Sequence, residues 1–196
     1  MFVVFGLNVR GAENLPEDGP AILVANHNSH IDTMLLMSIF PMRMISKINP
    51  VAAADYFFNT KFRKFLFKTL IGAIPLKRSG FVKEDIFADV NEVLKNNHIV
   101  IIYPEGTRSM THEIGDFKNG IYHLVKNNPN VPVIPIYMNG PDRIMPKYDS
   151  LIVPHICDSY IGKPLYYKDY NSREFTQAAH DSVVELKKIH TEKQKG

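Results

Sequence analysis

The sequence predicts an α/β fold, in which a single domain has a mixed, largely parallel central sheet flanked by helices. Short apolar runs bounded by polar residues alternate with longer segments of helical spacing, which is the order of strands and helices in such a domain. The chain has 196 residues, 45% of them hydrophobic, which is enough apolar material for one core. No repeat or linker divides it, so residues 1–196 are expected to form one domain.

The first predicted elements are a buried strand and the helix that follows it. Pro20–Asn26 is a short apolar run that ends in polar residues, which is typical of a buried strand that leads into a loop. Ser29–Phe40 then places apolar residues at helical spacing, and Pro41 ends the pattern. The strand therefore gives way to a helix near His27.

Later elements follow the same alternation. Three apolar runs predict core strands: Ala73–Leu76, His98–Tyr103 and Val131–Tyr137. Helices are expected at four segments: Lys61–Ile71, Val82–Asn96, Gly120–Asn127 and Ser172–Lys193. A final strand pair is expected around Ile152–Leu165. The two prolines in Val131–Tyr137 cannot donate ladder hydrogen bonds, which places this strand at an edge or a bulge. It could line an acyl pocket or form ordinary core.

Composition excludes several classes of protein. A single cysteine, Cys157, allows no internal disulfide and no cysteine pair for a metal, so a reducing compartment fits best. The apolar start, Met1–Gly6, is shorter than the stretch of about 7 to 15 apolar residues in a signal peptide. The longest apolar runs, Met34–Met42 and Val131–Met138, fall well below the roughly 20 residues that cross a bilayer. No segment is expected to span a membrane.

Basic residues gather in one region of the chain. Arg43–Lys83 contains nine lysines and arginines against one acid, Asp55, whereas the remaining sequence has more acids than bases. A basic block in a slightly acidic remainder indicates a face adapted to anions: lipid headgroups, phosphates or nucleic acid.

The first chemistry-bearing motif is Asn26–Asp32, at the predicted junction of strand and helix. Asp32 follows His27 by five residues, so its carboxylate can fold back and accept a hydrogen bond from one imidazole nitrogen. The other nitrogen is then available as a base, and the carboxylate stabilises the imidazolium that forms. Spacing alone leaves two alternatives open. Asp32 could simply cap the helix, or His27, His30 and Asp32 could be metal ligands.

The second motif, Tyr103–Ser109, follows another predicted strand. Gly106 permits a sharp turn, Thr107 offers a hydroxyl, and the planar guanidinium of Arg108 suits a phosphate monoester. The alternative is a polar turn in which Glu105 and Arg108 pair with each other. The strand Ala73–Leu76 also ends in cations, so Arg78 could share the phosphate or lie on solvated surface.

Taken in order, these segments resemble the glycerolipid acyltransferase family, specifically the 1-acyl-sn-glycerol-3-phosphate acyltransferases, which form phosphatidic acid. The shared pattern is Asn-His, four residues and Asp; a strand ending in arginine; Pro-Glu-Gly-Thr-Arg-Ser; and Val-Pro-Val-x-Pro. Tyr103 stands where the family prefers phenylalanine. Val51–Tyr56 occupies a position where many members carry a lysine and a glutamate.

The resemblance implies an enzyme that moves a fatty acyl group onto the sn-2 hydroxyl of lysophosphatidic acid. His27 would be the base and Asp32 its partner. The acceptor would be bound by seven residues: Asn28, Ser29, Arg78, Glu105, Gly106, Thr107 and Arg108. No cofactor and no metal are expected, because acyl-CoA or acyl carrier protein serves as co-substrate. The resemblance also implies a cytoplasmic protein that binds peripherally to the inner face of the membrane.

The basic-aromatic segment, Lys61–Lys68, is the predicted membrane contact. On a helix, Phe62 and Phe65 share a face beside a stripe formed by Lys61, Lys64 and Lys68. Such a helix binds an anionic membrane surface, where each basic residue contributes about 1 kcal/mol. The alternative is that the phenylalanines pack into the core.

Other functions remain open from the sequence. The acceptor could be another lysolipid, such as a lyso-aminolipid or lysophosphatidylglycerol. The chain could also be a lipid-surface binding domain without turnover. A nucleic-acid partner is not expected, because the basic block contains no recognisable DNA- or RNA-binding motif.

Overall fold

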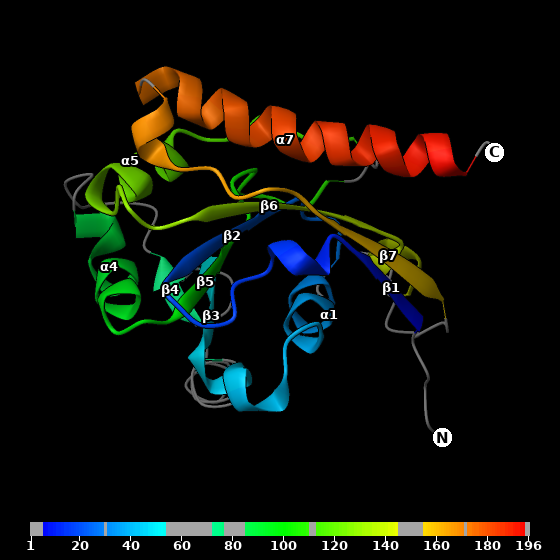
Figure 1. The fold of residues 1–196 in the computed structure, drawn as a ribbon, viewed down its shortest axis with the longest axis horizontal. Coiled ribbons are helices and arrows are strands. Elements are labelled where there is room, and N and C mark those ends of the chain that lie inside the picture. The colour runs from blue at the N-terminus through cyan, green and yellow to red at the C-terminus, as the bar shows by residue number, and fades with distance from the viewer. Residues whose placement is uncertain are drawn as a thin grey trace.

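The computed structural model describes residues 6–29, 31–53, 72–76, 85–109, 113–144, 155–170 and 172–194. Its strands are β1 (Gly6–Arg10), β2 (Ala21–Ala25), β3 (Ile48–Ala53), β4 (Ile74–Leu76), β5 (Ile99–Ile102), β6 (Val133–Asn139) and β7 (Ile156–Ile161). They form one sheet in the order β1-β7-β6-β2-β5-β3-β4 (Figure 1). Neighbours run parallel except β6 and β7, which are antiparallel. The predicted mixed, largely parallel sheet is confirmed.

The helices are α1 (Asp32–Ser38), α4 (Ala88–Lys95), α5 (Gly120–Asn127), α6 (Pro141–Ile144) and α7 (Ser172–Lys193). The bounds predicted for α5 and α7 are those of the structure, and α1 and α4 lie within their predicted segments. The helix predicted at Lys61–Ile71 lies outside the described residues. Instead of a strand pair near Ile152–Leu165, the described residues there form one strand, β7, and an isolated bridge between Val133 and Leu165.

Pro132 and Pro135, which lie before and within β6, do not mark a sheet edge. β6 lies inside the sheet, between β2 and β7, so the edge alternative is wrong. Val133 pairs with Leu165, and Ile136 pairs with Ile161. Three residue steps along β6 therefore lie opposite four steps along the segment from Ile161 to Leu165. Pro135 lies at this irregularity, where the ladder does not need its missing N–H, and its carbonyl accepts a hydrogen bond from the N–H of Gly162 at 2.8 Å.

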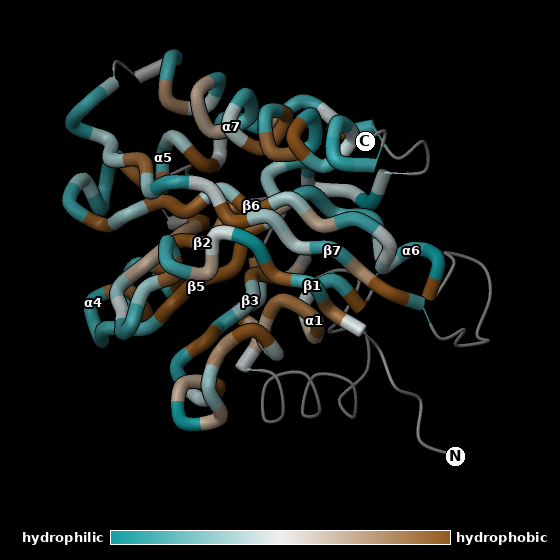
Figure 2. Tube along the Cα trace, turned by 45° about the vertical axis from the view of Figure 1, so that its right-hand side comes forward, coloured by the Kyte–Doolittle hydropathy of each residue, from teal (hydrophilic) through white to brown (hydrophobic). Residues whose placement is uncertain are grey.

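The sheet separates two hydrophobic cores because successive side chains of a strand point to opposite faces. In β2, Ile22 and Val24 join the core under α4, α5 and α7, whereas Leu23 joins the core under α1. Figure 1 shows α7 and α1 on opposite sides of the sheet. Figure 2 shows hydrophobic residues concentrated in β2 and β5, and every residue of both strands is buried. Val133–Met138 of β6 is buried in the same way, so its side chains form ordinary core.

The neighbouring strands β2 and β5 position the two motifs. They are parallel, and Val24 pairs with Ile102. Their carboxyl ends therefore meet at one edge of the sheet, where ligand sites of open α/β sheets are found. The loop that contains His27 and the loop that contains Glu105 leave this edge side by side.

Candidate active site

A hydrogen bond of 2.9 Å joins Nδ1 of His27 to Oδ2 of Asp32. The same carboxylate oxygen accepts the backbone N–H groups of Asn28 at 2.7 Å and of Ser29 at 2.9 Å. The Asp32 side chain is 1% exposed, and that of His27 is 20% exposed. This geometry fixes the plane of the imidazole and leaves Nε2 as the nitrogen that can take a proton.

Asn26 anchors the histidine loop to β6. Its side-chain amide donates to the carbonyl of Met138 at 2.9 Å and accepts the N–H of Met138 at 2.8 Å. The amide therefore continues the pairing of β2 and β6 by one step after the backbone of β2 has turned away. Because His27 directly follows Asn26, these two hydrogen bonds also fix the position of the His27 backbone.

The loop after β5 holds the backbone of His27 on both sides. Oε1 of Glu105 accepts the N–H of His27 at 2.9 Å, and the N–H of Ser109 donates to the carbonyl of His27 at 2.8 Å. The other oxygen of Glu105 accepts the N–H of Gly115 at 3.0 Å. The two predicted motifs thus form one hydrogen-bonded unit.

Tyr103 covers one face of the imidazole. Its ring is stacked on that of His27, with centroids 4.2 Å apart and an angle of 20° between the planes. Its hydroxyl is 3.0 Å from the hydroxyl of Thr33, the residue after Asp32 on α1. Tyr103 therefore contacts the histidine and is hydrogen-bonded to the helix that carries its partner.

Burial changes the acidity of two groups beside the histidine. It raises the pKa of Glu105 above its usual value, although the N–H groups of Gly115 and His27 act in the opposite direction. Burial and then the charge of Asp32 raise the pKa of Tyr103, so this phenol is neutral throughout the physiological range. Tyr103 is thus a packing and hydrogen-bonding group at the site.

Gly106 forms the sharp turn of the second motif. Its φ of +72° is in the left-handed region that favours glycine. A Cβ at this position would lie 2.6 Å from Nζ of Lys118, so the lysine side chain lies over the turn. Next along the chain, Thr107 is exposed and Arg108 is half-buried. Arg78, which was also predicted to bind the acceptor, lies outside the described residues.

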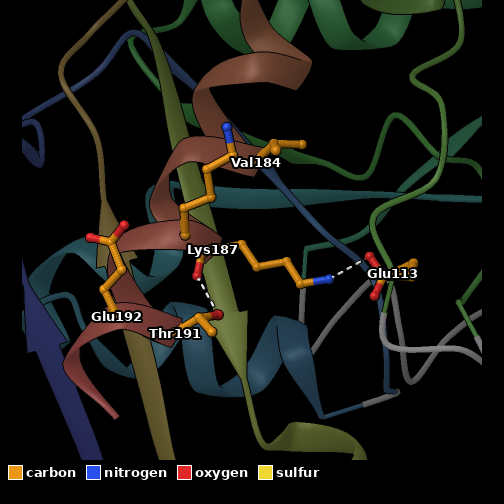
Figure 3. A pocket seen from close by; sticks show the side chains of 6 residues that line it. Glu113, Val184, Lys187, Thr191 and Glu192 are labelled. Carbon is orange, nitrogen blue, oxygen red and sulfur yellow. Dashed lines mark hydrogen bonds and ion pairs between the residues drawn. The ribbon is translucent and has the colours of Figure 1, made fainter. Parts of the chain in front are cut away.

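The residues that the structure describes contain no group of three or more histidine, cysteine, aspartate or glutamate side chains placed to hold a metal ion. His30 and the basic-aromatic segment, with its predicted membrane contacts Lys61, Phe62, Lys64, Phe65 and Lys68, lie outside them. None of the described helices is long and apolar enough to cross a bilayer. A surface hollow beside α7 is spanned by an ion pair of 2.6 Å between Lys187 and Glu113 (Figure 3). It lies on the α7 side of the sheet, opposite α1.

The sequence interpretation missed the anchoring role of Asn26, the stacking of Tyr103, the N–H donor of Gly115, and Lys118. Asn26 and Tyr103 stand inside the quoted motifs, so their positions were a usable signal. Gly115 and Lys118 follow the second motif by several residues, and only the folded loop brings them to it.

Comparison with known proteins finds a family and several relatives that are similar to this chain in sequence. A family model described as Acyltransferase matches residues 6–139. The chain is 32% identical over 162 residues to the chloroplastic 1-acyl-sn-glycerol-3-phosphate acyltransferase LPAT1 of Arabidopsis thaliana, covering 79% of this chain and 42% of that protein. It is 32% identical over 159 residues to the 1-acyl-sn-glycerol-3-phosphate acyltransferase of Saccharomyces cerevisiae, covering 76% and 48%. The chain thus spans less than half the length of these relatives.

A solved structure has the same fold. The crystal structure of the 1-acyl-sn-glycerophosphate (LPA) acyltransferase PlsC from Thermotoga maritima superposes with a TM-score of 0.74. The match has 23% sequence identity and covers 93% of this chain and 71% of that one.

Proposed function

The chain belongs to the acyltransferase family, and from this we propose that it moves a fatty acyl group onto the sn-2 hydroxyl of 1-acyl-sn-glycerol-3-phosphate. The donor is a thioester, acyl-CoA or acyl carrier protein, and the product is phosphatidic acid. The relatives named above support this acceptor. The observation that carries the proposal is the hydrogen bond from Nδ1 of His27 to the buried carboxylate of Asp32.

In this reaction His27 is the general base. Nε2 takes the proton of the acceptor hydroxyl as the oxygen attacks the thioester carbonyl, and Asp32 stabilises the resulting imidazolium. The tetrahedral intermediate then expels the thiolate, which takes the proton back from His27. No covalent acyl-enzyme forms. General-base catalysis of this kind contributes roughly 10²- to 10⁴-fold in rate, and holding the two substrates together contributes about 7 to 11 kcal/mol.

The turn after β5 binds the acceptor's phosphate in this proposal. Arg108 supplies a planar cation, Thr107 a hydroxyl, and Gly106 a turn that lets the backbone approach an anion. Lys118, which lies over Gly106, adds a second cation. Arg78, Asn28 and Ser29 keep the acceptor-binding roles that the resemblance implies.

The enzyme meets its acceptor at an anionic membrane surface, on the cytoplasmic face, through the basic-aromatic segment. Two exposed apolar side chains support contact near α1: Met34 is 62% exposed and Met42 is 88% exposed. Arg43, beside Met42, is also exposed and is suited to anionic headgroups.

The test is transfer of a radiolabelled acyl group from each donor to lysophosphatidic acid. The wild-type chain should form labelled phosphatidic acid, and His27→Ala should lower kcat at least 100-fold. His123→Ala, on α5, is the matched control and should keep wild-type activity. Failure of the wild type to form phosphatidic acid from either donor would contradict the proposal.

Parallel assays separate the alternatives. Faster transfer to a lyso-aminolipid or lysophosphatidylglycerol would change the acceptor but retain the chemistry. A binding domain without turnover would give no product with any acceptor, and its liposome binding would be unaffected by His27→Ala.

A further inference from the structure

We propose that Glu105 is a positioning residue that holds the loop of His27 in its reactive place. The inference rests on the proposed function and assigns Glu105 a different part in it from acceptor binding. Glu105 spans two segments of the chain, since its carboxylate joins the N–H of His27 to that of Gly115.

The bond to His27 is one of a set that leaves this residue little freedom. Glu105 accepts its N–H, Ser109 donates to its carbonyl, and Asp32 holds Nδ1 of its ring. The first two fix the backbone and the third fixes the ring. Because Asp32 lies on α1, a shift of the His27 backbone would change the distance between the ring and Asp32. Glu105 thereby acts on the direction of Nε2 without touching the substrate.

The carboxylate of Glu105 is poorly placed to bind a phosphate or glycerol group. The residue is 7% exposed, and each oxygen already accepts a backbone N–H. A Cβ added at Gly115 would lie 3.1 Å from Oε2, so the carboxylate is closely packed on that side. An ionised carboxylate in the proposed phosphate site would also repel the phosphate, whereas Arg108 and Lys118 attract it.

The charge of Glu105 has a cost that the two N–H donors partly offset. Burial raises its pKa, and both donors counteract that effect because they favour the ionised form. Glutamine has the same shape but only one acceptor oxygen. Its NH₂ group must face either His27 N–H or Gly115 N–H, so one bond becomes a contact between two donors.

The test is the kinetics of Glu105→Gln with lysophosphatidic acid and an acyl thioester. We expect kcat to fall about 10- to 100-fold, the loss that a displacement of about 1 Å produces. The KM for lysophosphatidic acid should stay within about twofold of wild type. Arg108→Gln is the contrast, because loss of a phosphate contact should raise that KM. Asp116→Asn, which neutralises an exposed neighbouring carboxylate, is the matched control and should match wild type in both constants.

Gly115→Ala is a second variant that leaves Glu105 unchanged and alters only the packing beside its carboxylate. Gly115 is exposed and its φ is not in the left-handed region, so the added methyl group acts mainly by its contact with Oε2. We expect a fall in kcat of a few fold with unchanged KM. This variant tests the proposal even if Glu105→Gln does not fold.

Nuclear magnetic resonance distinguishes positioning from a general loss of stability. In folded Glu105→Gln the ring signals of His27 should move from their wild-type positions while the amide signals of α7 stay in place, whereas a protein that has only lost stability would keep wild-type ring signals in its folded fraction. An unchanged kcat in both variants would overturn the proposal. So would a raised KM for lysophosphatidic acid at constant kcat, which would make Glu105 a headgroup contact. Failure of the proposed function is a separate result, because the wild type would then form no phosphatidic acid.

Discussion

The buried carboxylate of Asp32 allows a quantitative prediction for Asp32→Asn. Oδ2 of Asp32 accepts three hydrogen bonds, from Nδ1 of His27 and from two backbone N–H groups. These donors require the oxygen of an asparagine to take the place of Oδ2, because the NH₂ group would otherwise face three donors. The histidine therefore keeps its tautomer and orientation, and only the negative charge is lost.

The expected loss of rate follows from that charge. A charge-assisted hydrogen bond is roughly twice as strong as a neutral one, a difference of about 1.4 kcal/mol, or tenfold in rate. As an upper bound, the attraction between unit charges about 4 Å apart near a protein surface is about 4 kcal/mol, or roughly 10³-fold. We therefore expect kcat of Asp32→Asn to fall between about 10- and 10³-fold, with the KM for lysophosphatidic acid nearly unchanged.

Stability gives an independent check on the same variant. Oδ1 of Asp32 is buried and has no hydrogen-bond partner among the described residues. The NH₂ group of asparagine would occupy this place, so one unsatisfied buried group replaces another. The loss of stability then comes from the three hydrogen bonds at Oδ2, which change from charge-assisted to neutral and together weaken by about 1 to 3 kcal/mol. Urea unfolding should show a loss of this size. A folded Asp32→Asn protein whose kcat is within about twofold of wild type would refute the argument.

Three further predictions test other parts of the molecule. Replacing Lys61, Lys64 and Lys68 with glutamate should strongly reduce co-sedimentation with anionic liposomes, because each lost cation removes about 1 kcal/mol of attraction. The same reversal of three exposed lysines elsewhere, Lys95, Lys126 and Lys163, is the matched control, and equal losses in both proteins would contradict a specific contact. Steady-state assays of Lys118→Met should show a KM for lysophosphatidic acid that is several-fold higher and an unchanged kcat, because the second cation at the proposed phosphate site is lost. An unchanged KM would show that Lys118 does not bind the phosphate. The last concerns pH: burial raises the pKa of Glu105, so the folded state binds its proton more tightly than the unfolded state. The wild type should therefore lose free energy of unfolding relative to Glu105→Gln as pH rises from the usual glutamate pKa through the raised one. Urea titrations across this range measure the difference, and parallel curves would count against the shift.

Strong local patterns were enough to predict most elements of the fold. The long helical period of α7 and the uniformly apolar β5 were identified from sequence with nearly correct bounds. β1 and β3 were missed, because neither has a clear strand pattern. β1 is a short edge strand without a fully buried residue, and β3 contains Asn49 and Pro50. β3 is stabilised mainly by its neighbours, since it pairs with β5 at its start and with β4 at its end.

The candidate site divides in the same way between local and distant contacts. His27 and Asp32 are five residues apart, and a turn into a helix is enough to join them, so their pairing could be predicted. The bond between Glu105 and His27 joins residues 78 apart, and that between Asn26 and Met138 joins residues 112 apart. Both depend on β2 lying between β5 and β6, an order that hydrophobic patterns do not specify.

The pairing of β1 with β7 also has a consequence for how the protein is made. Gly6 is matched with Ile156, so the first described strand emerges from the ribosome about 150 residues before its partner. Closing so long a loop is slow and entropically costly. Until β7 has been synthesised, β1 remains an unpaired edge that other chains can bind. Nascent chains arrested before residue 156 should therefore aggregate more readily than chains arrested after β7 is complete.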